Sequence, residues 1–324
     1  MRHRDSGFGG VARWMALALA LSVAGIAAAQ EPAKAPRKDL VLKGDAVCTR
    51  CHGPEDDPKL FEIGKTKHGT VADGRTPTCT SCHGVSDTHV NRPAGVKERP
   101  KPERVFNRKS TTPPEVQNQA CLACHQGGKR IHWGGSAHAT RDTTCVSCHQ
   151  VHTAHDKVRD KVTQPEVCFA CHKEQRAQVN RPSRHPIREG KVACSDCHNP
   201  HGSAGPSLLV RDGVNDTCYA CHMEKRGPFV RTHQPVQENC AICHNPHGSI
   251  NDNLLRQRAP FLCQQCHEPT GHRGQIGRIA VPGVAGPFGT GTAGTVARGC
   301  ANCHTNIHGT NNPSDLTGER TFRR

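Results

Sequence analysis

The placement of cysteine constrains this chain more than any other feature. All 20 cysteines fall into ten Cys-x-x-Cys-His segments, so none is left over. The first cysteines are Cys48, Cys79, Cys121, Cys145, Cys168, Cys194, Cys218, Cys240, Cys263 and Cys300. The second cysteines are Cys51, Cys82, Cys124, Cys148, Cys171, Cys197, Cys221, Cys243, Cys266 and Cys303. The histidines that follow are His52, His83, His125, His149, His172, His198, His222, His244, His267 and His304. Ten copies of one pentapeptide predict ten copies of one chemical site.

Three kinds of chemistry use closely spaced cysteines. Paired Cys-x-x-Cys segments can bind zinc, and an even cysteine count in an exported chain can indicate disulfides. Neither explains a histidine directly after every second cysteine, whereas covalent haem attachment requires that residue. The two thiols would bind the haem vinyl groups, and the histidine would bind the iron. The sequence therefore predicts ten covalently attached c-type haems.

The first 29 residues are typical of a secretory signal peptide. Three arginines accompany an apolar run from Trp14 to Ala29 that closes with three alanines before Gln30. The run is too short and wrongly flanked for a stable membrane span. The first cysteine, Cys48, lies too far from this cleavage site to carry a lipid anchor. We therefore expect export to the periplasm and cleavage after residue 29.

The composition offers little apolar material for a protein core. Only 34% of the residues are hydrophobic and 3% are aromatic, which is low for a globular chain of this length. After cleavage, roughly 30 residues remain per haem, and pieces below about 40 residues seldom fold on apolar burial alone. We therefore expect the haems to form the core of a mostly irregular backbone with short α-helices.

The charge balance fits the same cofactor. The formal net charge is +15 at pH 7, which could suggest binding to nucleic acid. Each oxidised haem, however, adds a net charge of about −1 because two propionates outweigh the ferric porphyrin core. The basic residues are therefore expected to balance the haems, and no nucleic-acid partner is expected.

The remaining histidines reveal a repeated unit. The segment CHNPHGS occurs at residues 197–203 and again at 243–249. Around it, the order is attachment motif, lone histidine, attachment motif, lone histidine, and this order recurs about every 46 to 50 residues. Five stacked units of two haems each follow, with boundaries at residues 41–112, 113–160, 161–210, 211–258 and 259–310. A linker (30–40) precedes them and a tail (311–324) follows.

Ten irons with two histidine ligands would need ten lone histidines. Unit 2 offers four candidates, of which His138 and His152 match the spacing in the other units, whereas His132 and His155 do not. The predicted sixth ligands are His68, His89, His138, His152, His185, His201, His233, His247, His272 and His308. Met223 is the only methionine left after signal cleavage and is poorly placed to bind iron. The sequence thus predicts low-potential, outer-sphere electron transfer.

Two longer segments connect these motifs. Residues 90–120 are rich in proline and basic residues and predict an extended strap. Residues 271–299 hold nine glycines and predict a flexible loop inserted in unit 5, or else a segment that contacts a partner. Short helices are expected to lead into attachment motifs over Pro114 to Cys121 and Pro165 to Cys168.

Several longer segments resemble a known family. They include the two CHNPHGS segments, VNDTCYACHMEKRGP at 214–228 and RAPFLCQQCH at 258–267. Together with the start of unit 2, they are similar to the periplasmic decahaem cytochromes of the MtrA/DmsE type, including the PioA and MtoA branches. The resemblance spans roughly residues 41–315 and covers all ten motifs and the ten chosen lone histidines.

The resemblance implies an elongated haem wire enclosed by an outer-membrane β-barrel partner. Electrons would pass between periplasmic or inner-membrane cytochromes and the cell exterior, with an extracellular multihaem cytochrome as a further candidate partner. Two alternatives remain open: a soluble periplasmic shuttle, and a reductase with one five-coordinate haem. The ligand set is the same whether electrons leave the cell for a metal acceptor or enter it from Fe(II).

Overall fold

The computed structural model describes residues 45–69, 75–107, 109–267, 300–302, 304–312 and 322. All of them lie within one unit of the chain, Val41–Arg324. The predicted signal peptide, the linker and the glycine-rich insertion at 271–299 lie outside the described residues, as do His272, Cys303 and most of the tail.

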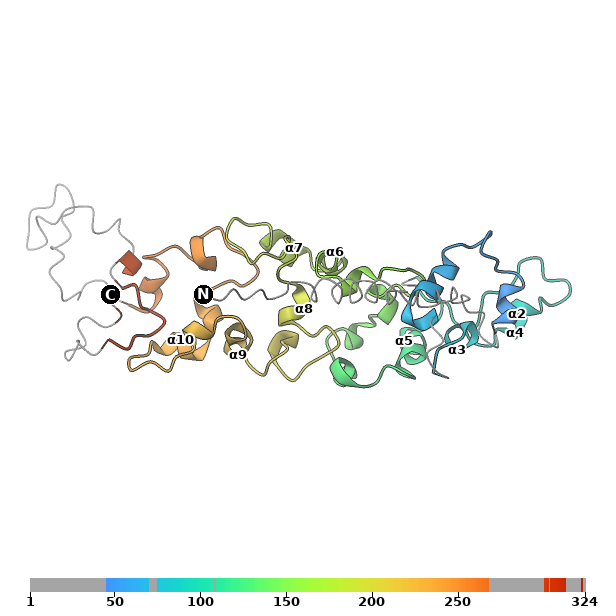
Figure 1. The fold of residues 1–324 in the computed structure, drawn as a ribbon, viewed down its shortest axis with the longest axis horizontal. Helices are drawn as coiled ribbons and strands as arrows, with labels where there is room; N and C mark the ends of the chain where they lie inside the picture. Colours follow the sequence, from blue (N-terminus) through green and yellow to red (C-terminus); the bar gives the residue numbers. More distant parts are fainter. Residues whose placement is uncertain are drawn as a thin grey trace, which may run out of the picture. The chain divides into compact units, whose positions relative to one another are not determined.

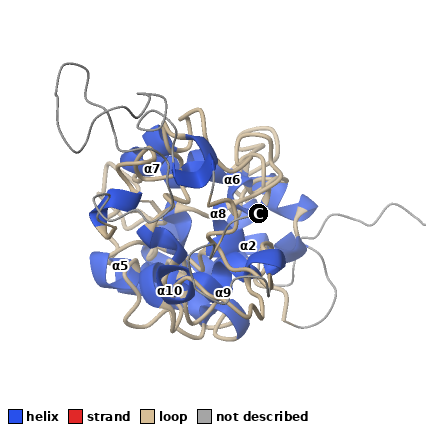
Figure 2. Cartoon of the chain, turned by 90° about the vertical axis from the view of Figure 1, so that its left-hand side faces the viewer, coloured by secondary structure: helices blue, strands red, loops and turns tan. Residues whose placement is uncertain are grey.

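Short helices joined by loops make up the described chain (Figures 1 and 2). The α-helices are α2 (Ala46–Thr49), α3 (Cys79–His83), α4 (Asp87–Val90), α5 (Pro114–Leu122), α6 (Gln164–Phe169), α7 (Lys173–Gln178), α8 (Cys194–Cys197), α9 (Val214–Tyr219) and α10 (Gln234–Glu238). The 3₁₀ turns are η1 (Leu60–Lys65), η2 (Lys67–Gly69), η3 (Gly128–Arg130), η4 (Ala139–Arg141), η5 (Cys145–Ser147), η6 (Lys157–Arg159), η7 (Pro206–Leu208), η8 (Met223–Lys225), η9 (Cys240–Ile242), η10 (Asp252–Leu254), η11 (Cys263–Gln265) and η13 (Cys300–Asn302). Extended pairing within the described residues is limited to isolated bridges. The predicted irregular backbone with short helices is confirmed.

Proline positions explain where two of these helices start. Pro114 begins α5 and Pro165 lies in the first turn of α6, where a missing backbone N–H costs nothing and a fixed φ favours the helix. Both helices run into an attachment motif, as the sequence predicted. The described residues of 91–113, which leave out residue 108, contain no helix, whereas the last part of the predicted strap, from Pro114 onward, is helical in α5.

Each attachment motif folds into a single turn. In nine of them the structure gives a hydrogen bond from the histidine N–H to the carbonyl of the first cysteine, at 2.9–3.0 Å. Residues three and four positions apart lie on the same side of a helical turn. This turn therefore directs both cysteines and the histidine of a motif toward the same side.

In three units, a side chain just before the first motif accepts a hydrogen bond from the backbone of the second motif. Asn118 accepts a hydrogen bond from the backbone N–H of Cys145 (2.8 Å), and Asn215 accepts one from Cys240 (2.7 Å). Asp45 accepts the same bond from Cys79 in unit 1. All three acceptors lie three residues before the first cysteine of their unit. In unit 3, Gln164 serves a similar purpose by accepting from the N–H of Ser195.

The same turn occurs once in each of the predicted units 3 and 4. His198 forms an isolated bridge with Leu209, and 46 residues later His244 forms the same bridge with Leu255. Ser207 and Asn253 occupy equivalent places in the two turns, with φ of 51° and 55°. The equal spacing and equal conformation show that CHNPHGS begins one local structure used twice.

The protein itself contributes a small core. Among the described residues, five hydrophobic side chains are buried, and three of them, Phe169, Val179 and Ile187, pack together in unit 3. Within the same residues, no helix has both the length and the apolar character that a membrane crossing demands. The fold therefore relies on something other than aliphatic and aromatic packing.

Candidate haem-binding sites

The histidine rings come together in pairs. Nine pairs have ring centres 5.8–6.3 Å apart, and each joins one motif histidine to one lone histidine. They are His52–His89 (6.1 Å), His68–His125 (5.8 Å), His83–His152 (6.3 Å), His138–His172 (6.1 Å), His149–His201 (6.0 Å), His185–His222 (6.3 Å), His198–His247 (6.0 Å), His233–His267 (6.0 Å) and His244–His308 (6.0 Å).

This spacing suits a metal ion between two imidazoles. Rings in direct contact would place their atoms about 3.5–4.0 Å apart. A metal bound to one nitrogen of each ring at about 2.0–2.1 Å would instead separate the ring centres by about 6 Å. The observed centre separations leave room for such a metal, but ordinary aromatic pairs span a similar range, as Trp133–His201 at 6.4 Å shows. The assignment therefore depends on the consistent combination of one motif histidine with one lone histidine in all nine pairs.

The pairing follows a rule along the chain. The first lone histidine of a unit faces the first motif of the next unit, as His138 of unit 2 faces His172 of unit 3. The second lone histidine of a unit faces the second motif of the unit before it, as His201 of unit 3 faces His149 of unit 2. Two pairs therefore join each unit to the next, and the His52–His89 pair lies within unit 1.

Hydrogen bonds at Nδ1 orient many of these rings. The lone histidines His89, His138, His152 and His185 donate from Nδ1 to backbone carbonyls at 2.7–2.9 Å. Those carbonyls belong to Pro100, Pro200, Leu60 and Pro246, respectively. Metal-binding histidines are commonly fixed in this way, since a bonded Nδ1 leaves Nε2 as the free acceptor. The bonds thus select the tautomer that a metal requires.

Burial keeps several of these rings neutral. It lowers the pKa of His201 to about 4, and it also lowers the pKa values of His68, His83 and His247. In each case desolvation of the charged form is the main cause. A neutral imidazole offers a lone pair to a metal, whereas a protonated one does not.

The attachment cysteines also meet in pairs. In every unit the first cysteines of the two motifs lie close enough for one to alter the pKa of the other: Cys48–Cys79, Cys121–Cys145, Cys168–Cys194, Cys218–Cys240 and Cys263–Cys300. The proximity of Cys145, together with burial, raises the pKa of the Cys121 thiol. The two attachment sites of a unit therefore lie side by side.

Two arginines near these histidines have a buried nitrogen without an acceptor. The Nε atoms of Arg104 and Arg184 are buried and have no hydrogen-bond acceptor, although the guanidinium of Arg184 also pairs with Glu189 at 3.2 Å. Arg104 also presents its carbonyl to His83, and Arg184 directly precedes His185 in the chain. Guanidinium groups bind carboxylates strongly, so a haem propionate would suit the free Nε of either arginine.

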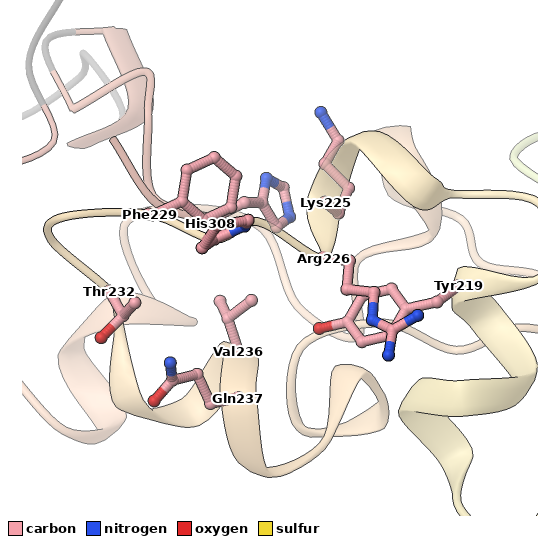
Figure 3. A pocket seen from close by; sticks show the side chains of 9 residues that line it. Tyr219, Lys225, Arg226, Phe229, Thr232, Val236, Gln237 and His308 are labelled. Carbon is pink, nitrogen blue, oxygen red and sulfur yellow. The ribbon is translucent and has the colours of Figure 1, made fainter. Parts of the chain in front are cut away.

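A cavity of about 130 Å³ adjoins one of the imidazole pairs (Figure 3). It is bounded by His308 and by the aromatic rings of Tyr219 and Phe229, with Lys225 and Arg226 also in its wall. Aromatic faces beside two cations match a flat apolar macrocycle with acidic edges. Within the described chain, no group of three or more His, Cys, Asp or Glu side chains is arranged to hold a metal ion. The aromatic and basic residues around the cavity are of the kind that would contact the apolar edge and the propionates of a haem.

The two histidines rejected in unit 2 belong to none of the facing pairs. His155 approaches Asp160, with 3.7 Å between Nε2 and Oδ2. The backbone carbonyl of His132 lies close to Gly202, whose φ of +109° and tight surroundings favour glycine there. In the tenth motif, His304 is described, whereas its predicted partner His272 is outside the described residues.

Comparison with known proteins bears on the identity of these sites. The family described as "Doubled CXXCH motif" matches residues 185–227 and 233–272, and "Cytochrome c-type protein NrfB-like" matches residues 79–163. The chain is 45% identical over 276 residues to "Multiheme cytochrome MtrA" of Shewanella baltica, which covers 84% of this chain and 80% of that protein. The chain belongs to the MtrA family of multihaem cytochromes. It is also 30% identical over 161 residues to "Cytochrome c-type protein NrfB" of Haemophilus influenzae, covering 43% of this chain and 70% of that protein.

As an MtrA-family cytochrome, the chain is an electron-transfer protein that binds haem c covalently at its Cys-x-x-Cys-His motifs. Sequence reasoning identified the motif and lone histidines as candidates but did not assign partners. The structure brings together nine of the ten predicted lone histidines with motif histidines. Sequence reasoning also missed Asp57 and Asp156, which bond to motif histidines and which follow them by only five and seven residues.

Proposed function

We propose that all ten motifs carry haem c and that each iron is bound by two histidines. The ligand pairs are the nine facing pairs described above, and His304 with His272 completes the set. The support is the geometry of the nine pairs, because every one combines a motif histidine with a histidine chosen from spacing alone. The haem supplies a one-electron Fe(III)/Fe(II) couple when bound.

The protein's own groups favour electron transfer over substrate chemistry. Two imidazoles would hold each iron, so a small oxyanion or oxygen would find no exchangeable position. Nδ1 hydrogen bonds, such as those of His138 and His185, hold the rings in place between oxidation states. Little reorganisation is then needed when an electron arrives or leaves. The alternative of a reductase with an open haem is disfavoured at all nine of these sites.

The pairing also supplies a route. Irons bound across the boundary between two units, as by His68 and His125, would place haems of successive units next to each other. The adjoining cysteines Cys121 and Cys145 would do the same for the two haems within a unit. We infer that electrons move from unit to unit in chain order.

The similarity to MtrA supports a proposal for where in the cell this electron route lies. We propose that the mature protein lies in the periplasm and is associated with the outer membrane through a β-barrel partner that encloses it. Electrons would pass between periplasmic or inner-membrane cytochromes and the cell exterior, with an extracellular multihaem cytochrome as a further candidate partner. Metal reduction and Fe(II) oxidation both fit this role.

Liposomes can test the conduit. The tagged chain is purified from its native membrane together with whatever barrel accompanies it, and is inserted into liposomes that contain a membrane-impermeant redox dye. Reduced donor added outside should bleach the internal dye. Liposomes carrying the barrel without the cytochrome serve as the control and should not respond.

The same preparation separates the conduit from a shuttle. A chain that is recovered without any membrane protein, and that leaves the internal dye oxidised, would overturn the conduit and favour a periplasmic electron shuttle. Retention of ten haems in that sample would show that ligation and electron transfer stand independently of the barrel.

A further inference from the structure

The motif histidines differ in what their Nδ1 atoms bond to. His83, His198 and His244 donate to backbone carbonyls, at 2.7–2.9 Å. His52 and His149 instead bond to carboxylates: Asp57 Oδ2 at 2.8 Å and Asp156 Oδ2 at 2.7 Å. His222 also lies near a carboxylate, but its Nδ1 is 3.7 Å from Glu224 Oε1, which is too long for a hydrogen bond. Two of the proposed irons would therefore have a histidine ligand that is hydrogen bonded to a carboxylate.

The repeated units allow the Nδ1 acceptor of the same motif histidine to be compared from one unit to the next. The second motif histidine of units 1 to 4 bonds in turn to Arg104 O, Asp156 Oδ2, Ser207 O and Asn253 O. Three units use a neutral carbonyl at this place, and unit 2 alone uses a carboxylate. Units 1, 3 and 4 therefore serve as an internal reference for the effect of the carboxylate in unit 2.

Both carboxylates are held in place by the local backbone. Asp156 directly precedes η6, and its second oxygen accepts a hydrogen bond from the N–H of Gln150 at 3.3 Å. The N–H of Asp57 donates to Gly53 O at 2.9 Å, which closes a tight turn after the first motif. The contacts to His52 and His149 are therefore built by short-range structure and do not depend on a long exposed side chain.

We propose that Asp57 and Asp156 are redox-tuning residues that lower the potentials of the haems bound by His52–His89 and His149–His201. This inference rests on the proposed two-histidine ligation of those irons. An imidazole that donates its N–H to a carboxylate gains negative character and becomes a stronger donor to the metal. The added charge stabilises the ferric state more than the ferrous state, so reduction becomes harder.

The effect is larger at Asp156 than at Asp57. The Asp156 side chain is 16% exposed, whereas that of Asp57 is 46% exposed, and burial reduces screening of a charge by water. His201, the other proposed ligand of the same iron, has a buried Nδ1 with no hydrogen-bond partner. Lys129 and Arg130 lie near His201 and act in the opposite direction, but neither is hydrogen bonded to the ligand pair. The contact at 2.7 Å therefore dominates.

The consequence is an uneven potential along the proposed route. The His52–His89 haem belongs to the first motif in the chain, and the His149–His201 haem joins units 2 and 3. Electrons would encounter one low-potential haem in unit 1 and a second, lower one between units 2 and 3. Haems with carbonyl-bonded histidines would lie at higher potential on either side of the second.

Substitution of one carboxylate by an amide tests the proposal on the full holoprotein. Asp156→Asn removes the charge and keeps the size, and Asp57→Asn does the same at the other site. Asp160→Asn is the matched control, because Asp160 lies near His155 and contacts neither member of a facing pair. A redox titration followed by visible absorbance should show one haem moving to higher potential in Asp156→Asn. The shift should be smaller in Asp57→Asn and absent in Asp160→Asn.

Two further measurements keep the outcome interpretable. Asp156→Glu, which restores a carboxylate, should return the moved haem toward its original potential. The low-spin signature of every variant should stay that of the parent, because no iron ligand is changed. An unchanged titration in Asp156→Asn with an intact low-spin spectrum would overturn the tuning role while leaving ligation untouched. A high-spin haem in Asp156→Asn would also overturn it, since Asp156 would then be needed to keep the ligand bound. His201→Ala tests the ligation separately and should produce one high-spin haem.

Discussion

At the residue scale, the sequence was enough to predict which histidines bind iron, but not which two histidines share one iron. The histidine after each second cysteine marks one iron ligand, and the spacing of the lone histidines selected ten candidates for the other. Which lone histidine meets which motif depends on contacts over long distances in sequence, such as His152 Nδ1 to Leu60 O, 92 residues away. No local pattern encodes such a contact.

Unit 2 offers a direct test of ligand choice. His152 lies 6.3 Å from His83 between ring centres, whereas His155 faces Asp160. Replacing His152 by Ala should leave one iron with a single histidine and convert one haem to high spin. The absorption spectrum of the oxidised protein reports this change. His155→Ala is the control and should retain the parent spectrum. The reverse result would show that His155, and not His152, binds the His83 haem.

At the element scale, the attachment turns depend on side chains just ahead of them. Asp45, Asn118 and Asn215 occupy the same place in three units, three residues before the first cysteine, and each receives an N–H from the second motif. This regular position of Asp or Asn was visible in the sequence. Its role was not, because the bonded N–H lies 25 to 34 residues further along.

Loss of one such contact should weaken its unit. Asn118 is buried and bonds both to the N–H of Cys145 and to the carbonyl of Thr143. We expect Asn118→Ala to lower stability by about 1–3 kcal/mol, because buried polar groups are left unpaired. Thermal unfolding of the mature protein measures this loss. Asn180→Ala, at an exposed site with one local bond to Arg176 O, should change the midpoint little. Equal effects of the two substitutions would contradict the proposed role of Asn118.

At the scale of the whole molecule, the composition predicted how little protein core there would be. Buried hydrophobic side chains are few in the described residues, and the largest cluster, around Phe169, serves only unit 3. Facing histidines join every unit to the next, so the proposed irons act as cross-links between units. The sequence suggested separate two-haem units; the pairing indicates that each unit needs its neighbours to complete its sites.

The fold should therefore depend on haem. Without it, the folded state would lose both its core and its cross-links, as in small domains that fold only when they bind metal. We expect the chain produced in a host that lacks haem-attachment machinery to show a circular dichroism spectrum typical of disorder and rapid digestion by protease. The mature protein under the same conditions should resist. A helical, protease-resistant apoprotein would contradict this dependence.

The central claim is that ten haems are each bound by two histidines within one chain. Near-infrared magnetic circular dichroism of the fully oxidised mature protein distinguishes low-spin iron with two imidazole ligands from high-spin iron, and its intensity can be scaled to protein concentration. The account predicts a signal equal to ten low-spin, two-histidine haems per chain, with no high-spin component. A smaller number of such haems, or a high-spin component in the unmodified protein, would contradict it.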